Sequence, residues 1–142
     1  MSNIHASCVS WQDKGILLLG GSGRGKSDLC LRLIKNYDAV LVADDRVDLN
    51  VSRETIFASA PKIMEGMLEV RGVGILQLPF VSQNKLDLVV ELVGDLSELE
   101  RFPEPQNWEY EGVKLPLIKL FSFEVSAAEK IIAALSWPRA VK

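Results

Sequence analysis

The sequence has few residues of the kinds that build metal sites, disulfide frameworks and membrane spans. Its 142 residues include two cysteines and one histidine. Neither Cys8 nor Cys30 has a second cysteine or a histidine at zinc-ligand spacing, so we expect two buried free thiols. No apolar run approaches the roughly 20 residues that cross a bilayer, and no basic stretch leads into an apolar one near the start. We therefore expect a cytoplasmic protein without a membrane partner.

An excess of positive charge is also absent. The formal net charge is −3 and the sequence pI is about 5.2. The chain as a whole therefore has no electrostatic reason to bind nucleic acid, and any phosphate binding must be local. A content of 48% apolar and 25% charged residues is typical of a globular protein. The length predicts a single domain over residues 1–142.

Apolar periodicity predicts two buried strands and a helix in the first half of the chain. Residues 16–19 are wholly apolar and bounded by glycines, which is typical of a strand buried on both faces. A strand at 4–11 would precede it in a hairpin with a turn at 12–15. Residues 26–36 repeat apolar side chains every three or four positions, which predicts an amphipathic helix. A second apolar strand at 39–43 completes a βαβ-like beginning.

Strand patterns dominate the rest of the chain, so we expect an α/β domain with a largely β core and few helices. The expected strands are 47–51, 55–59, 68–78 and 86–93, followed by an edge strand at 114–120 that tolerates Pro116. Between them we expect a short helical turn at 96–101, capped by Ser97 with Glu100, and a loop at 103–112. A final helix is predicted to start with a capping box at Ser126 and to end before Pro138.

The clearest functional motif is a glycine-rich loop between the first buried strand and the first helix. It matches the phosphate-binding pattern G-x-x-x-x-G-K-[ST], and its residues are Gly20, Gly21, Ser22, Gly23, Arg24, Gly25, Lys26 and Ser27. Glycines let backbone N–H groups turn toward phosphates, and the helix N-terminus adds partial positive charge. Lys26 would reach the β- and γ-phosphates, and the Ser27 hydroxyl can bind Mg²⁺. The motif predicts a P-loop nucleotide-binding domain.

Two adjacent carboxylates follow the second buried strand. Asp44 and Asp45 stand at its C-terminal end, where acidic groups of such sheets meet the metal and the γ-phosphate. Neighbouring side chains of an extended backbone point to opposite sides. One carboxylate could therefore hold Mg²⁺ while the other accepts a hydroxyl proton. This pattern favours phosphoryl transfer over nucleotide binding alone.

A second charged pair lies on a later strand. If residues 68–70 are extended, Glu69 and Arg71 emerge on one face, where a carboxylate would meet Mg²⁺ and a guanidinium the transferring phosphate. A surface salt bridge is the alternative. Residues 84–87 spell the N-K-x-D that reads guanine in GTPases. No aspartate is followed by glycine three positions on, so we interpret them as an ordinary turn.

These pieces together resemble the HPr kinase/phosphorylases, which phosphorylate a serine of the phosphocarrier protein HPr. The resemblance depends on His5 in an opening strand, the glycine-rich loop followed by Asp28, the segment VADDR at 42–46 and the segment LEVRGVGI at 68–75. It implies a phosphoenolpyruvate carboxykinase-like kinase architecture. It also implies ATP and Mg²⁺ as cofactors, and assembly into a homo-oligomer, a hexamer in this family.

The resemblance assigns roles to individual residues. It implies that Asp44 is the general base that takes the serine proton, and the acid that returns it in the reverse reaction. Lys26 would stabilise the transferring phosphoryl group, and Ser27 and Glu69 would hold Mg²⁺. His5 would lie close to the reacting phosphate.

Arg101 would contact the reaction centre from a mobile loop, although a solvated position on a short helix is the alternative. Long members of the family carry an N-terminal domain, so this sequence resembles a short form reduced to the catalytic domain. They also carry a segment rich in proline and arginine that is linked to dephosphorylation, where this chain has LPLIKLFSF at 115–123.

Three functions remain open from the sequence. The first is an ATP-dependent serine kinase that acts on HPr, with or without the reverse phosphorylase activity. The second is a small-molecule P-loop kinase, for which the loop at 103–112 would be the lid. The third is a regulatory module that senses ATP without catalysis, and the combination of Lys26, Asp44 and Glu69 argues against it.

Overall fold

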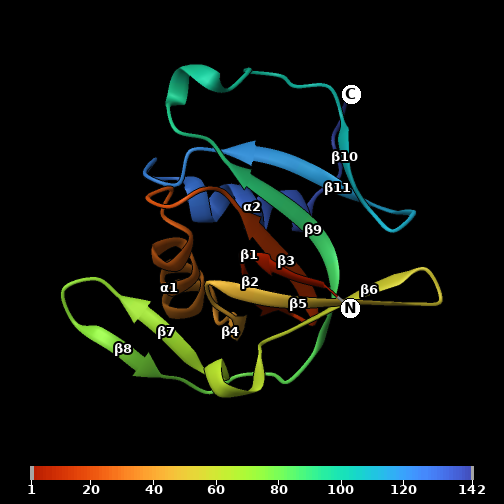
Figure 1. Cartoon of the computed structure of the whole chain (residues 1–142). Helices are drawn as coiled ribbons and strands as arrows, with labels where there is room; N and C mark the ends of the chain where they lie inside the picture. Colours follow the sequence, from red (N-terminus) through yellow and green to blue (C-terminus); the bar gives the residue numbers. More distant parts are fainter. Residues whose placement is uncertain (1, 142) are drawn as a thin grey trace.

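The computed structural model describes residues 2–141, which form a mostly-β α/β fold with two α-helices, α1 and α2 (Figure 1). The strands of the main sheet run in the order β1-β5-β6-β9-β3-β2-β4, with β11 and β10 added beside β9. Their bounds are β1 Ser2–His5, β2 Ser7–Trp11, β3 Lys14–Leu19, β4 Val40–Ala43, β5 Arg46–Ser52, β6 Thr55–Ser59, β9 Asn84–Leu92, β10 Gln106–Tyr110 and β11 Val113–Leu120. A separate hairpin consists of β7 Met67–Val70 and β8 Gly74–Gln77. The expected fold class, an α/β fold with a largely β core, is confirmed.

The central strands are buried on both faces, as the wholly apolar run at 16–19 predicts. Ile16 and Leu18 of β3 belong to the apolar cluster beneath α1 (Lys26–Tyr37) and α2 (Ala127–Ser136). Leu17 belongs to a second cluster on the opposite face, which β5, β6, β10 and β11 cover. Adjacent side chains of a strand point to opposite faces, so one continuous apolar run serves both clusters.

Strand β9 connects the central strands to the two outer pairs, β5–β6 and β10–β11. One of its edges pairs with β3 in parallel. Its other edge pairs first with β6 near Lys85 and then with β11 from Val89 to Leu92. Because β9 changes partner along its length, β5–β6 and β10–β11 diverge and both lie over the same face of the central strands (Figure 1).

The beginning of the chain departs in one respect from a simple βαβ unit. The turn predicted at 12–15 is confirmed, and Gln12 and Asp13 both have positive φ, of 49° and 66°, as a two-residue hairpin requires. Strand β2 then inserts between β3 and β4, antiparallel to both. The segment predicted as one strand at 4–11 is broken at Ala6, so β1 pairs with β5 while β2 pairs with β3 and β4.

Several expectations for the second half are wrong. Residues 68–78 form the β7–β8 hairpin, since Gly72 at φ 86° turns the chain. The segment 103–112 contains the outer strand β10, which pairs with β11. Strand β11 is consequently internal, and Pro116 is tolerated because β9 pairs only from Leu117 onward.

The predicted helix caps also differ from the observed ones. The short 3-10 turn at Leu96–Glu98 is capped by Asp95, whose carboxylate accepts from the Ser97 backbone N–H, and not by Ser97 with Glu100. Ser126 precedes α2 as expected but makes no capping bond through its side chain.

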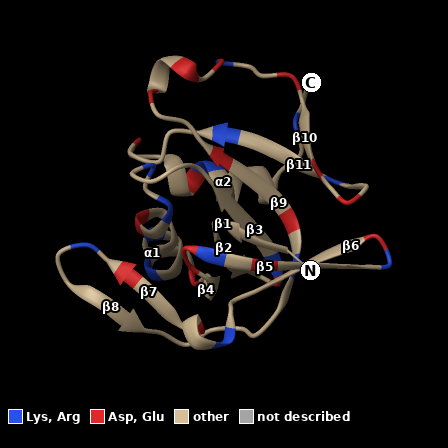
Figure 2. Cartoon of the chain, viewed as in Figure 1, with Lys and Arg blue, Asp and Glu red and all other residues tan. Residues whose placement is uncertain are grey.

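Positive and negative side chains are interspersed over the elements (Figure 2). Both cysteines are buried free thiols, as predicted. Within residues 2–141, no helix is both long enough and apolar enough to span a bilayer.

Candidate active site

A cavity of about 550 Å³ lies where the glycine-rich loop, the start of α1, the end of β1 and the β7–β8 hairpin meet. Most of the predicted site residues either line this cavity or bond to its walls. The lining residues are His5, Ser7, Ser22, Gly23, Gly25, Lys26, Ser27, Asp28, Leu31, Asp45, Glu69, Val70, Arg71 and Phe123.

The glycine-rich loop connects β3 to α1 and needs its glycines for backbone conformation and close packing. Gly23 and Gly25 have φ values of 81° and 84°, which favour glycine. A β-carbon at Gly25 would lie 2.3 Å from the Ser122 Oγ atom and 3.2 Å from the Phe123 ring. The loop therefore packs directly on the segment that precedes α2.

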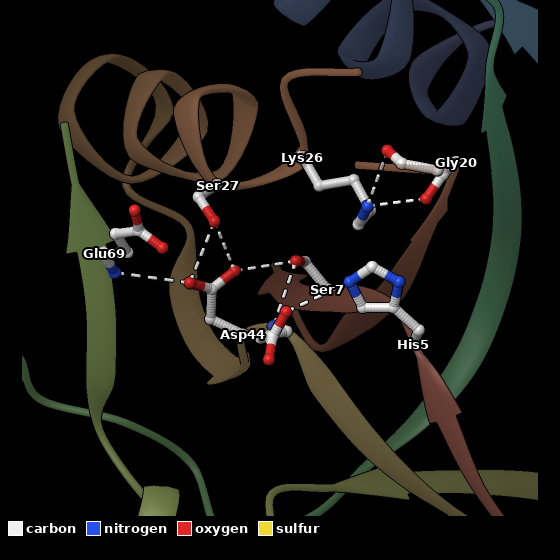
Figure 3. Close-up of polar contacts among 9 residues, drawn as sticks. His5, Ser7, Gly20, Lys26, Ser27, Asp44 and Glu69 are labelled. Carbon is white, nitrogen blue, oxygen red and sulfur yellow. Dashed lines mark hydrogen bonds and ion pairs between the residues drawn. The ribbon is translucent and has the colours of Figure 1, made fainter. Parts of the chain in front are cut away.

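Lys26 is buried at the start of α1, and its Nζ atom turns back toward the glycine-rich loop. It donates to the carbonyl oxygens of Gly20 at 2.5 Å and Gly21 at 3.1 Å (Figure 3). Burial lowers the pKa of Lys26, and the carboxylates of Asp45 and Asp44 partly oppose that shift. The ammonium group is thus held at the loop by backbone oxygens and two nearby negative charges.

Asp44 is the centre of a buried hydrogen-bond network (Figure 3). The Asp44 residue is only 5% exposed. Oδ1 accepts from the Ser7 hydroxyl at 2.7 Å and from the Ser27 hydroxyl at 2.8 Å. Oδ2 lies 2.9 Å from the same Ser27 hydroxyl and accepts from the Glu69 backbone N–H at 3.3 Å. Asp44 thereby ties the first turn of α1 to β2 and β7.

Asp45 has the opposite surroundings, although it is the next residue. Its side chain is 61% exposed, and its Oδ1 atom lies 3.0 Å from Nε2 of His5. Strand β4 ends at Ala43, and Asp45 has φ 69° while the Arg46 N–H bonds back to the Asp44 carbonyl at 2.8 Å. This tight bend directs the Asp45 side chain to the cavity. A backbone that stayed extended at Asp45 would direct it elsewhere.

Glu69 of β7 and Arg71 of the turn that follows it line the cavity, and Val70 between them lines it as well. The predicted separation of Glu69 and Arg71 from Val70 on opposite faces is therefore not what the structure has. Glu69 lies beside the Ser27–Asp44 pair (Figure 3). Within residues 2–141, no group of three or more His, Cys, Asp or Glu side chains is arranged as a metal cage. Mg²⁺ does not need such a cage, because one or two carboxylates, a hydroxyl and nucleotide phosphates satisfy it. The side-chain oxygens of Ser27 and Glu69, with Asp44 hydrogen-bonded behind Ser27, therefore fit this ion.

Two features of the site are not indicated by any sequence motif. Ser7 lies on β2 and bonds to Asp44, and the sequence shows only that it falls within a predicted strand. Phe123 forms part of the cavity wall and is 59% exposed. Its segment is fixed to α1 by Arg32, which donates to the carbonyls of Ser122, Glu124 and Val125, and no local pattern reveals these contacts.

Arg101 is not brought to this cavity. It lines a second cavity of about 280 Å³ that β11, α2 and the segment before β10 form. Its guanidinium carbon lies 5.0 Å from the centre of the Phe102 ring. Arg24 does not line the first cavity either, and its guanidinium donates to the Leu92 carbonyl at the end of β9 at 3.4 Å. The other predicted site residues line the first cavity or, like Gly20, Gly21 and Asp44, bond to residues that do. The role predicted for Arg101 stays untested.

Fold and site together define a mostly-β α/β domain in which a glycine-rich loop and several carboxylates border one cavity. The family model of the HPr serine kinase C-terminal domain matches residues 1–136. The chain belongs to this family.

Sequence relatives agree with that assignment. The chain is 36% identical to an HPr kinase/phosphorylase of Clostridium tetani over 112 residues, which are 79% of this chain and 36% of the relative. It is 34% identical to an HPr kinase/phosphorylase of Clostridium acetobutylicum over 131 residues, 87% of this chain and 40% of the relative. The chain thus corresponds to well under half the length of these relatives.

A solved structure has the same fold. The Hpr(Ser) kinase/phosphatase from Coxiella burnetii superimposes with a TM-score of 0.81, covering 92% of this chain and 91% of that one at 24% sequence identity. At this level of identity the likeness concerns the fold.

Proposed function

We propose that this protein is an ATP-dependent serine kinase whose substrate is the phosphocarrier protein HPr. The observation that carries the proposal is the meeting of Lys26, Ser27, Asp45 and Glu69 around one cavity beside the glycine-rich loop. Membership of the HPr serine kinase C-terminal domain family and relatives named HPr kinase/phosphorylase support the choice of substrate. We also propose the phosphoenolpyruvate carboxykinase-like kinase architecture that the resemblance implies.

ATP would bind with its phosphates on the glycine-rich loop, where backbone N–H groups and the N-terminus of α1 favour negative charge. Lys26 would exchange its bonds to the Gly20 and Gly21 carbonyls for phosphate oxygens. Ser27 and Glu69 would hold Mg²⁺, with Asp44 behind Ser27. When bound, the ion neutralises charge on the transferring phosphoryl group.

The geometry favours Asp45 over Asp44 as the group that accepts the serine proton. A general base must come within hydrogen-bond reach of the hydroxyl that it deprotonates. Asp45 is exposed at the cavity and is oriented by His5, whereas the oxygens of Asp44 already accept from Ser7, Ser27 and Glu69. The role that the resemblance gives to Asp44 therefore passes to its neighbour in our proposal, and Asp44 orients Ser27.

Phosphoryl transfer needs positioning and charge stabilisation more than covalent chemistry. The serine hydroxyl would enter the cavity next to Asp45, with Lys26 and Arg71 close to the transferring group. Assembly into a homo-oligomer, and a location in the cytoplasm, stay predictions from the resemblance. Light scattering of the purified chain would measure the former.

The decisive experiment incubates the chain with Mg-ATP and HPr and maps phosphoserine by mass spectrometry. We expect one phosphorylated serine with the wild type and none with Lys26→Met. The Ser10→Ala variant is a matched control, since Ser10 is buried on β2 but bonds to Asn84 away from the cavity. Absence of phosphoserine with wild-type protein that binds Mg-ATP would contradict the proposed substrate. A second arm supplies phospho-HPr with inorganic phosphate, and pyrophosphate formation would reveal the reverse reaction.

A further inference from the structure

The Ser7 hydroxyl lies at a buried position where packing alone would favour an apolar side chain. It is 0% exposed in strand β2, between buried Ala6 and buried Cys8. Burying a hydroxyl is unfavourable unless it forms hydrogen bonds. The contacts of Ser7 show what the hydroxyl is for.

The Ser7 Oγ atom connects both aspartates of the site. It donates its single proton to Oδ1 of Asp44 at 2.7 Å and accepts from the backbone N–H of Asp45 at 3.4 Å. The neighbouring backbone contact, from the Ala6 N–H to the Asp45 carbonyl at 3.2 Å, holds the same bend against the junction of β1 and β2. One serine thus contacts a buried carboxylate and the backbone of the exposed one (Figure 3).

These bonds affect the metal-binding side of the cavity through Asp44. Ser27 has one hydroxyl proton, and both oxygens of Asp44 lie within 2.9 Å of its Oγ atom. While Asp44 stays in place, it accepts the hydrogen bond of the Ser27 hydroxyl. The lone pairs of the Ser27 oxygen are then free for another partner. Without the bond from Ser7, the carboxylate could rotate away from this orientation.

We propose that Ser7 is a positioning residue that holds Asp44 so that the Ser27 oxygen is available to Mg²⁺ of bound Mg-ATP. The inference rests on the nucleotide site of the proposed function, but it does not depend on the protein substrate. It assigns to Ser7 an effect on metal-dependent binding rather than on folding alone. Ser7 itself touches neither nucleotide nor substrate in this proposal.

The test compares Ser7→Ala with Ser10→Ala, because both remove a buried β2 hydroxyl that bonds to a side-chain oxygen. Binding of a fluorescent ATP analogue is titrated with and without Mg²⁺, and urea unfolding measures stability. We expect Ser7→Ala to raise the Mg²⁺ concentration at half-saturation about tenfold, the size of one lost hydrogen bond to a charged group. Metal-free binding should change less than about twofold, and Ser10→Ala should leave both values unchanged.

A double-mutant cycle identifies the route of the effect. In the Asp44→Asn background, Ser7→Ala should cause no further change in half-saturation, since residues acting through one partner are not additive. A folded Ser7→Ala protein with wild-type Mg²⁺ dependence would overturn the inference, as would equal weakening of binding with and without Mg²⁺. Wild-type protein that fails to bind Mg-ATP would instead overturn the proposed function. Wild type that binds Mg-ATP but does not phosphorylate HPr leaves the Ser7 test intact.

Discussion

Asp44 and Asp45 are adjacent in the sequence, but the two carboxylates lie in different surroundings. The Asp44 residue is 5% exposed and accepts from two hydroxyls and a backbone N–H. The Asp45 side chain is 61% exposed and contacts His5. The bend at Asp45, with φ 69°, separates them. We call Asp44 together with its partners Ser7, Ser27 and the Glu69 N–H the buried network. We call the His5–Asp45 contact the open pair. In our proposal, the buried network organises the cation site and the open pair meets the substrate.

The largest expected effect comes from breaking the open pair at its carboxylate. Asp45→Asn keeps the shape of the side chain but removes a proton acceptor, so turnover should fall about 10²- to 10⁴-fold. Mg-ATP affinity should change little, and the free energy of unfolding should stay within about 0.5 kcal/mol because the side chain is exposed. Phosphorylation kinetics together with nucleotide titration would measure this. Retention of wild-type turnover would return the general-base role to Asp44.

Breaking the buried network should give the converse pattern. In Asp44→Asn, one carboxylate oxygen becomes an NH₂ group, which cannot accept a hydrogen bond. At the Oδ1 position it loses the bonds from the Ser7 and Ser27 hydroxyls, and at the Oδ2 position it loses the bond from the Glu69 backbone N–H. We expect destabilisation of about 1–3 kcal/mol and Mg-ATP affinity lowered roughly tenfold or more. Urea unfolding and nucleotide titration provide the readouts. If Asp44→Asn is as stable as wild type and binds Mg-ATP equally, the network has no organising role.

A smaller effect is expected at the other member of the open pair. His5→Gln removes the ring that contacts Asp45 but leaves the carboxylate in the cavity, so turnover should fall about tenfold, as for one lost hydrogen bond. Stability should be unchanged because the contact between the two side chains is solvent-exposed. Equal turnover losses in His5→Gln and Asp45→Asn would mean that the histidine participates directly in the chemistry.

Local sequence signals predicted the parts of the fold that depend on short-range patterns. The apolar run of β3 and the periodicity of α1 are complete within a few residues, and both elements lie where expected. Strand β10 was missed because its sequence QNWEY is short, partly exposed and preceded by two prolines, so it has the composition of a loop. Only its pairing with β11 makes it a strand.

The candidate site shows the same division. The glycine-rich loop, Asp44, Asp45 and Glu69 form motifs that can be recognised in sequence, and all of them meet at one cavity or bond to its walls. Ser7 could not be predicted, because its contact with Asp44 spans 37 positions and depends on the register that pairs Cys8 with Ala43. The assignment of different surroundings to the two aspartates required the backbone bend, which no pattern indicates.

The smallest expected effect concerns the pKa of Lys26, which both aspartates influence. Burial lowers this pKa from 10.5, while Asp45 and then Asp44 raise it. Asp45→Asn should therefore lower it further than Asp44→Asn, which NMR titration of the lysine Nζ signal would measure. Below the depressed pKa the buried charge disfavours folding in full. Between that pKa and 10.5 the unfolded chain binds more protons, so the stability of the wild type should rise with pH relative to Lys26→Met. Parallel pH profiles in urea unfolding of the two proteins would contradict a depressed pKa and the burial that causes it.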